Sequence, residues 1–187
     1  MEMLASELVL DYGLYPRSHT NPIHVAELAT ARVAGAVLPA VIADETTHRV
    51  VDGFHRTQAA LKVDGPMARL EVELRRYATE QELFLDAVRL NAQHGLRMTT
   101  YDRARSLVLA RELQVDETLL AQALQVPPEV LRRLEVRRVG FSPDGTEIPL
   151  KASAEHLAGT RLSEIHLRAP RGSAGMKIVF YANQLLN

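Results

Sequence analysis

The sequence predicts an α+β protein in which a mixed first half is followed by an all-helical second half. Residues 69–78 alternate apolar and charged side chains, which is the period of a half-buried strand. Two β-branched runs, at 41–43 and 49–51, flank a polar turn and indicate a hairpin. After residue 79 apolar side chains recur every three or four positions, as on one face of a helix. This change of period puts the boundary near residues 94–96.

In the first half, glycine and proline mark where each element stops. Gly13 and Pro16 end an expected strand that starts at residue 5, and Gly35 and Gly65 close two expected helices. The expected elements are a strand in 5–12, a helix in 23–34, a hairpin over 41–51, a helix in 54–64 and a strand in 69–78.

In the second half, the helical period returns in four segments. We expect helices over 79–95, 99–114, 116–124 and 128–138. A turn-rich linker at 140–150, a short helix at 152–159, a flexible loop at 168–175 and an apolar helix at 176–187 follow.

Composition limits the class of function. A chain of 187 residues with 47% hydrophobic content can bury a core, and its lack of cysteine excludes disulfides, thiolate catalysis and cysteine zinc sites. No apolar run approaches the roughly 20 residues that span a bilayer, and no leader pattern opens the chain, so we expect a soluble cytoplasmic protein without membrane contact.

The distribution of charge points to one segment. The net charge is −1, so the chain as a whole has no attraction for nucleic acid. Residues 97–138, however, hold eight arginines against six acidic residues. Arginine suits phosphate and guanine edges, which indicates a local binding patch. The alternative explanation is a general preference of the chain for arginine over lysine, since it has only three lysines.

The stretch "DGFHR" lies where a strand ends and a helix begins. Gly53 frees the backbone, so the first helical amides form an anion site. Arg56 adds a charged fork, His55 can donate or carry a proton, and Asp52 is a candidate base or metal ligand. Alternatively, Asp52 caps the helix and Arg56 makes a surface ion pair. No Walker loop or G-x-G-x-x-G is present.

The stretch "LLAQALQVPPEVLRRLEVRR" has helix-turn-helix spacing. A tight turn at 125–127 separates two helices, with the small Ala121 at their close approach and Pro128 opening the second. Gln125 stands where a glycine usually opens the turn. The candidate DNA contacts of the second helix are Arg132, Arg133, Arg137 and Arg138. A structural helical hairpin with a solvated arginine face is the alternative.

These stretches, in this order over residues 5–138, resemble the ParB/sulfiredoxin superfamily. The ParB motif G-x-x-R-x-x-A, which holds the triphosphate of CTP, is matched by Gly53, Arg56 and Ala59. The later E-N-x-x-R motif is matched by Asn91, with Leu90 in place of the glutamate and His94 in place of the arginine. Without that carboxylate, the magnesium ion loses an expected oxygen ligand, and Asn91 remains as the metal candidate. The resemblance implies nucleotide binding by Arg17, Gly53, Phe54, His55, Arg56, Thr57, Asn91 and His94.

The resemblance also implies function. The pattern N-x-x-H-G followed by T-x-x-D-R more closely resembles that of ParB-domain transcription regulators and of phage or plasmid ParB-like proteins. It implies a nucleoid-associated protein that binds double-stranded DNA in transcription regulation or partition and responds to CTP with magnesium. Because helix-turn-helix proteins commonly bind DNA as two-fold dimers, we also expect a homodimer. Its expected domains are a ParB/sulfiredoxin-like domain at 1–95, a helix-turn-helix domain at 96–138, and a linker with a helical, possible dimerisation segment at 139–187.

Two enzymatic relatives bear on the same loop. Sulfiredoxin carries its catalytic cysteine where this chain has Phe54, which excludes reductase chemistry. ParB-like free-serine kinases read D-G-H-H-R, so Asp52 would be the base that activates a hydroxyl. The kinase therefore stays open as the alternative to DNA binding, as does a weak CTPase activity.

Overall fold

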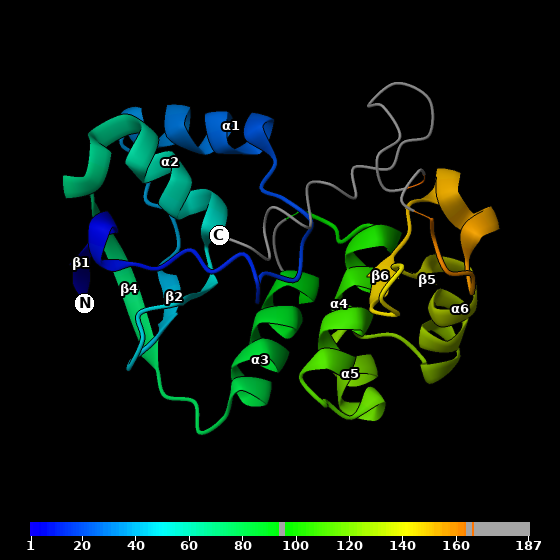
Figure 1. Cartoon of the computed structure of the whole chain (residues 1–187). Helices are drawn as coiled ribbons and strands as arrows, with labels where there is room; N and C mark the ends of the chain where they lie inside the picture. Colours follow the sequence, from blue (N-terminus) through cyan, green and yellow to red (C-terminus); the bar gives the residue numbers. More distant parts are fainter. Residues whose placement is uncertain (94–95, 164–165, 167–187) are drawn as a thin grey trace. The chain divides into compact units, whose positions relative to one another are not determined.

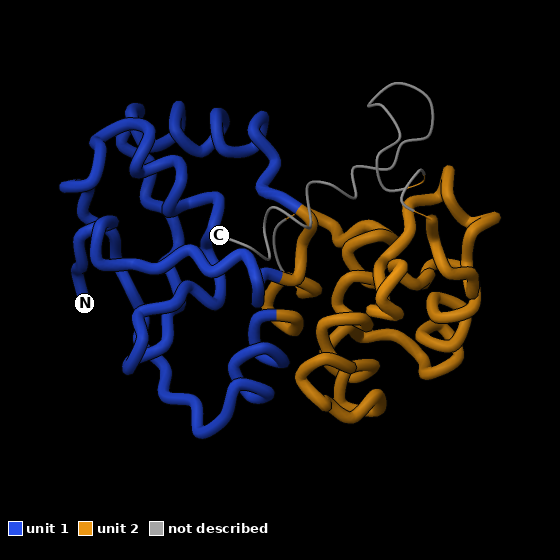
Figure 2. Tube along the Cα trace, in the orientation of Figure 1, with its two compact units in different colours: residues 1–15, 19–87 blue, residues 16–18, 88–187 orange. Residues whose placement is uncertain are grey.

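The structure is a computed structural model that describes residues 1–93, 96–163 and 166. The chain forms two compact units (Figure 2). Unit 1 comprises Met1–Tyr15 and His19–Ala87, and unit 2 comprises Pro16–Ser18 and Val88–Asn187. The division between Ala87 and Val88 falls inside the helix expected at 79–95, and the domain limits given above stay predictions.

Unit 1 contains a four-stranded sheet of order β1-β4-β2-β3 (Figure 1). The strands are β1 (Glu2–Leu4), β2 (Val41–Asp44), β3 (Val50–Asp52) and β4 (Arg69–Arg75). β2 and β4 run parallel, with Val41 beside Val72, while the β1–β4 and β2–β3 pairs are antiparallel. The expected hairpin and the alternating strand are thus confirmed. Alternate residues of β4 are buried, as the period of two requires.

Two helices cover this sheet in successive layers. Helix α2 (Phe54–Asp64) packs on the strands through Phe54 and Ala60, which belong to the sheet core. Helix α1 (Pro22–Val33) then packs on α2, where Val25 and Ala29 meet Ala59 (Figure 1). The Asn21 side chain caps α1 by accepting from the first amides of the helix. Both helices were expected from the sequence.

The strand expected at 5–12 is wrong. The edge strand is β1, which ends at Leu4, and a 3₁₀ turn, η1 (Ala5–Glu7), follows it. The Glu7 carboxylate accepts from the Leu4 amide at 2.7 Å, which favours a turn over an extended chain. Beyond that turn, only an isolated bridge pairs Val9 with Arg49. A second 3₁₀ turn, η2 (Gly65–Met67), joins α2 to β4.

The helices of unit 2 follow the expected order. They are α3 (Glu80–Gln93), which begins in unit 1, α4 (Thr100–Glu112), α5 (Glu117–Ala123) and α6 (Pro128–Arg138). Thr99 and Asp102 form a reciprocal capping box at the start of α4. Helix α4 is buried on most of its surface, so it is the central helix of the unit. Among the described residues, no helix is long and apolar enough to cross a membrane.

The segment after α6 differs from the expected turn-rich linker. It forms a hairpin of β5 (Val139–Phe141) and β6 (Glu147–Pro149), followed by a 3₁₀ helix, η3 (Ala152–Leu157). Leu150, Ala154 and Leu162 are almost fully buried in one cluster within this segment. The Leu150 amide donates to the Arg138 carbonyl, which ties the segment to α6. The expected loop at 168–175 and apolar helix at 176–187 lie outside the described residues.

Candidate nucleic-acid interface

Gly53 begins α2 in a conformation that favours glycine. Its φ of 110° and ψ of 17° are left-handed. A Cβ atom there would lie 3.0 Å from both Val41 Cγ2 and Arg56 Nη2. The close approach and the positive φ together explain why the chain places glycine between β3 and α2.

The Arg56 guanidinium is held by hydrogen bonds to Asp52 and to the backbone of Ala40. Its Nη2 donates to Asp52 Oδ2 at 2.8 Å and to the Ala40 carbonyl at 3.1 Å. The two side chains of the ion pair are only 19% and 20% exposed. Arg56 Nε is buried and finds no acceptor in the part of the chain that the structure describes. Asp52 therefore pairs with Arg56 rather than capping α2, which has no side-chain cap.

Of the remaining side chains of this loop, Phe54 and Thr57 are buried and His55 is partly buried. Phe54 is buried and stacks on Tyr15, with ring centroids 4.0 Å apart. Thr57 is fully buried. His55 Nε2 accepts from the Asn21 amide at 2.9 Å, so it supports the start of α1. Phe54 and His55 thus contribute to the fold, while the Thr57 hydroxyl has no hydrogen-bond partner within the described residues.

Two predicted nucleotide contacts come together in unit 2. Arg17, only 7% exposed, donates through Nε to Asn91 Oδ1 at 2.9 Å and through Nη2 to the Asn91 carbonyl at 3.0 Å. Arg17 also donates to the Leu96 carbonyl. Leu90, which stands where the resemblance implies a glutamate, is a buried core residue. His94 lies outside the described residues.

These residues do not fit a magnesium ion. Asn91 Oδ1, the expected metal ligand, already accepts from Arg17, and Leu90 offers no oxygen. Within residues 1–93, 96–163 and 166, no group of three or more histidine, aspartate or glutamate side chains could hold a metal.

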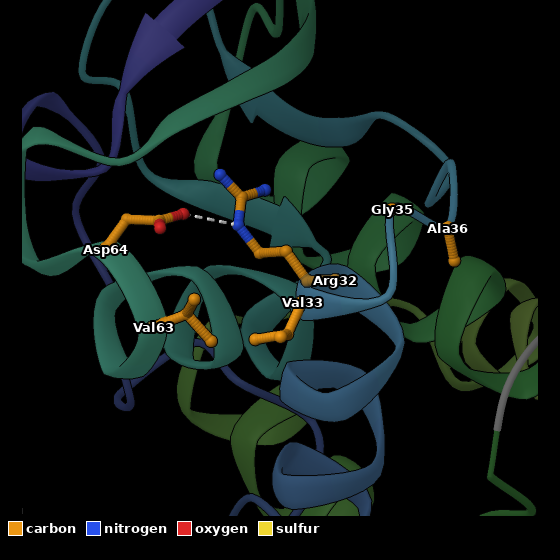
Figure 3. Close-up of a pocket in the computed structure, with 6 residues that line it drawn as sticks. All are labelled: Arg32, Val33, Gly35, Ala36, Val63 and Asp64. Carbon is orange, nitrogen blue, oxygen red and sulfur yellow. Dashed lines mark hydrogen bonds and ion pairs between the residues drawn. The ribbon is translucent and has the colours of Figure 1, made fainter.

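A pocket of about 470 Å³ lies where the carboxyl ends of α1 and α2 meet (Figure 3). Arg32 Nε donates to Asp64 Oδ2 at 2.7 Å at its wall, and Arg32 Nη2 also donates to the Arg69 carbonyl. None of the predicted site residues lines this pocket. The pair ties α1 to α2 and β4.

The turn between α5 and α6 has an unusual residue at its sharpest point. Gln125 adopts a left-handed φ of 54°, which usually requires glycine. The Gln125 amide donates to the Gln122 carbonyl and the Val126 amide to the Ala121 carbonyl, which closes α5. Pro127 and Pro128 then start α6. The turn lies at the position that the sequence predicts.

The two helices pack through the faces that the sequence indicates. Leu120 and Ala121 of α5 and Leu124 at its end are at most 2% exposed. Leu131 and Leu134 of α6 are buried as well. The polar side of α6 consequently faces outward.

The four candidate arginines of α6 divide into two pairs. Arg137 Nε donates to Glu155 Oε1 at 2.5 Å, and Arg138 Nη2 lies 3.2 Å from Glu155 Oε2. Arg132 and Arg133 are exposed and have no ion pair or hydrogen bond with the described chain. Glu155 comes from η3, and no periodicity links it to α6, so the sequence could not reveal this contact.

Arg111 of α4 holds the surrounding elements in place. Its guanidinium lies 2.8 Å from Glu117 of α5, 3.0 Å from Glu135 of α6 and 3.0 Å from Glu147 of β6. Burial opposes the charge, but hydrogen bonds to Glu117 and Glu135 outweigh it and raise the pKa of Arg111. One cation therefore ties α5, α6 and β6 to α4, and the sequence pattern does not reveal it.

Comparison with known proteins assigns the fold. The C-terminally truncated chromosome-partitioning protein ParB from Caulobacter crescentus, complexed to the centromeric parS site, aligns with a TM-score of 0.52 and 15% identity. The alignment covers 100% of this chain and 91% of that one. The chain therefore has a ParB-like α+β fold, as its motifs indicated. The same protein complexed with CTP-gamma-S aligns with a TM-score of 0.43 and 16% identity, over 100% of this chain and 98% of that one.

A curated relative is more similar in sequence over a shorter stretch. A possible regulatory protein of the streptomycin biosynthesis operon of Streptomyces griseus is 39% identical over 80 residues. The match covers 42% of this chain and 22% of that protein, about a fifth of its length. No family model matches the sequence.

Proposed function

We propose that this chain is a DNA-binding protein of ParB type, in which α5, the turn at Gln125 and α6 form a helix-turn-helix. The observation that carries the proposal is the pair Arg132 and Arg133, which are exposed and unpaired within the described chain, on the helix after the tight turn. In such motifs the second helix enters the major groove of DNA. The ParB of Caulobacter crescentus, whose fold this chain shares, was solved on its parS site, which supports the proposal.

The chemistry of these two side chains fits a nucleic acid. A guanidinium makes two parallel hydrogen bonds to a phosphate or to guanine, and no internal carboxylate has to be displaced from Arg132 or Arg133 first. Arg137 and Arg138 are also candidate contacts, but Glu155 competes with a phosphate for both. We therefore assign the principal contact to Arg132 and Arg133.

Transcription regulation or partition is the proposed setting. The Streptomyces griseus relative is described as a possible regulatory protein, and the structural relative partitions chromosomes. We propose that the protein acts at the nucleoid as a homodimer, since helix-turn-helix proteins commonly bind two half-sites about one DNA turn apart.

The salt dependence of DNA binding tests the proposal. Replacing both Arg132 and Arg133 with alanine should reduce the slope of log K against log salt concentration by about 1.8, since each phosphate contact contributes about 0.9. The matched control replaces Arg69 and Arg76, two exposed arginines of unit 1, and should leave the slope unchanged. If the Arg132/Arg133 variant has the same slope as the native chain, α6 does not contact the DNA phosphates.

We also propose that the loop at residues 52–57 binds the phosphates of CTP. The buried Arg56 Nε without an acceptor in the described chain, directly over Gly53, supports this. Asp52 already neutralises Arg56 and its carboxylate repels a phosphate, so binding should be weak. Because Asn91 Oδ1 accepts from Arg17 and Leu90 offers no oxygen, binding should not require magnesium. CTP should raise the melting temperature of the chain, by mass action, and Arg56→Ala should abolish the rise. A rise that persists in Arg56→Ala would move the site elsewhere.

A further inference from the structure

Four exposed residues form one stripe along α6: Glu129, Arg132, Arg133 and Val136. Positions three and four apart lie on the same side of a helix, so these side chains are neighbours. None of the three charged residues has a hydrogen bond or an ion pair with the described chain. We call this set the α6 stripe.

Glu129 is out of place on a surface that only contacts phosphate. A carboxylate beside the DNA backbone is repelled, and the residue lies in the first turn of α6, close to the two arginines. A carboxylate does have one good partner in the major groove, the N4 amino group of cytosine, because glutamate can only accept hydrogen bonds and cytosine presents a donor there.

Val136 supports contact with base edges as well. It is 71% exposed, so it covers no core, and it lies one turn beyond Arg132 and Arg133. An apolar side chain gains nothing next to a phosphate, whereas the thymine methyl group in the major groove is an apolar partner. The α6 stripe thus combines one hydrogen-bond acceptor, two guanidinium donors and one apolar side chain.

The start of α6 is poor in backbone donors. Pro127 and Pro128 have no N–H groups, and the Val130 amide donates to the Pro127 carbonyl at 2.9 Å. The amino end of α6 therefore has fewer free amides for a phosphate than an ordinary helix start, so we expect recognition to rest mainly on side chains.

We propose that Glu129 is a specificity-determining residue that reads a cytosine in the DNA site, with Arg132 or Arg133 on an adjacent guanine or phosphate. This inference rests on the proposed function, because it requires α6 to lie in the major groove. Glu129 would contribute little to affinity and much to the choice of sequence, since the carboxylate also weakens binding to DNA that lacks the cytosine.

Selection of binding sites from random duplex DNA tests the inference. The full chain and Glu129→Gln are each used to enrich sites, and affinities for the enriched site and its single-base variants are then measured. The native chain should prefer cytosine at one position by about tenfold or more. Glu129→Gln should shift that position towards adenine, since glutamine pairs with adenine N6 and N7. Glu71→Gln, the same change at an exposed residue of β4, should keep the native preference.

The outcomes separate the inference from the proposed function. If both proteins enrich the same site with the same preferences, Glu129 does not read a base, while DNA binding by α6 stands. If the native chain enriches no site and binds no duplex, the proposed function itself fails. A loss of the cytosine preference in Glu129→Gln, with the rest of the site unchanged, supports the assignment.

Discussion

Replacing Gly53 with alanine should destabilise unit 1 strongly. A left-handed conformation costs an L-residue about 1–2 kcal/mol. The new Cβ would also lie 3.0 Å from Val41 Cγ2, and Val41 is fully buried in a central strand and cannot retreat. It would lie equally close to Arg56 Nη2, so Arg56 must leave Asp52 and Ala40. Crowding of a packed core costs about 1–3 kcal/mol. Loss of the ion pair between Arg56 and Asp52 costs up to about 1 kcal/mol more.

Gly35→Ala provides the matched control. Gly35 also has a positive φ, 78°, but a Cβ there meets no atom within 4 Å. Both variants lose the same freedom in the unfolded chain, which offsets part of the strain by about 0.4–1 kcal/mol and cancels in the comparison. The difference between the two variants therefore isolates the close approach, and we expect Gly53→Ala to be less stable by about 2 kcal/mol.

Urea unfolding provides the measurement. The near-ultraviolet signal of the five tyrosines includes that of Tyr12 and Tyr15, which pack against Phe54 in unit 1. The free energy of unfolding follows from the midpoint and the slope of the transition. Equal midpoints for Gly53→Ala and Gly35→Ala would refute the claim that the core and Arg56 close over Gly53.

Three further changes test other features. Gln125→Gly should stabilise unit 2 by about 0.5 kcal/mol, because relief of the left-handed strain exceeds the added freedom of the unfolded chain, and a lower urea midpoint would contradict this. The hydrogen bond from Arg49 lowers the pKa of Glu80 below its ordinary value near 4.5, so the pair stabilises the fold above that pH and is lost as the pH falls through the lowered pKa. The stability gap between the native chain and Glu80→Gln should thus close on acidification, and a gap that stays constant from pH 7 to pH 3 would argue against the pair. Glu155→Gln should free Arg137 and Arg138, tighten DNA binding and steepen its salt dependence by about one unit or more, whereas an unchanged slope would show that neither arginine reaches a phosphate.

The elements that were predicted correctly have long, regular patterns. The strand at 69–75 buries alternate residues, and helices α1 to α6 each show a periodic apolar face or a clear cap. The elements that were missed are three residues long. β1, β5 and β6 are too short to show an alternation. The pairing of β1 also depends on a strand far along the chain, with Arg69 opposite Leu4, whereas β5 and β6 form a local hairpin.

The candidate sites divide in the same way. The sequence located the turn at Gln125 and the exposed Arg132 and Arg133, since these follow from local spacing. It could not locate the contacts that occupy Arg17 and Arg137, because these join distant segments. Arg17 meets Asn91 across 74 positions, and Glu155 meets Arg137 across 18. A pattern of residue types does not reveal which charged groups are already paired.

The membership of residues 16–18 in unit 2 limits how this protein can be recombined. Arg17 donates to Asn91 and the Ser18 amide to Asp102 Oδ1, so three residues from near the beginning of the chain complete a unit that otherwise starts at residue 88. A gene fragment that starts at residue 88 would encode unit 2 without residues 16–18, which would remain on the fragment that encodes unit 1. Exchange of the two units between relatives as separate cassettes should therefore give poorly folded chimeras, unless the short amino-terminal segment is transferred from the same parent.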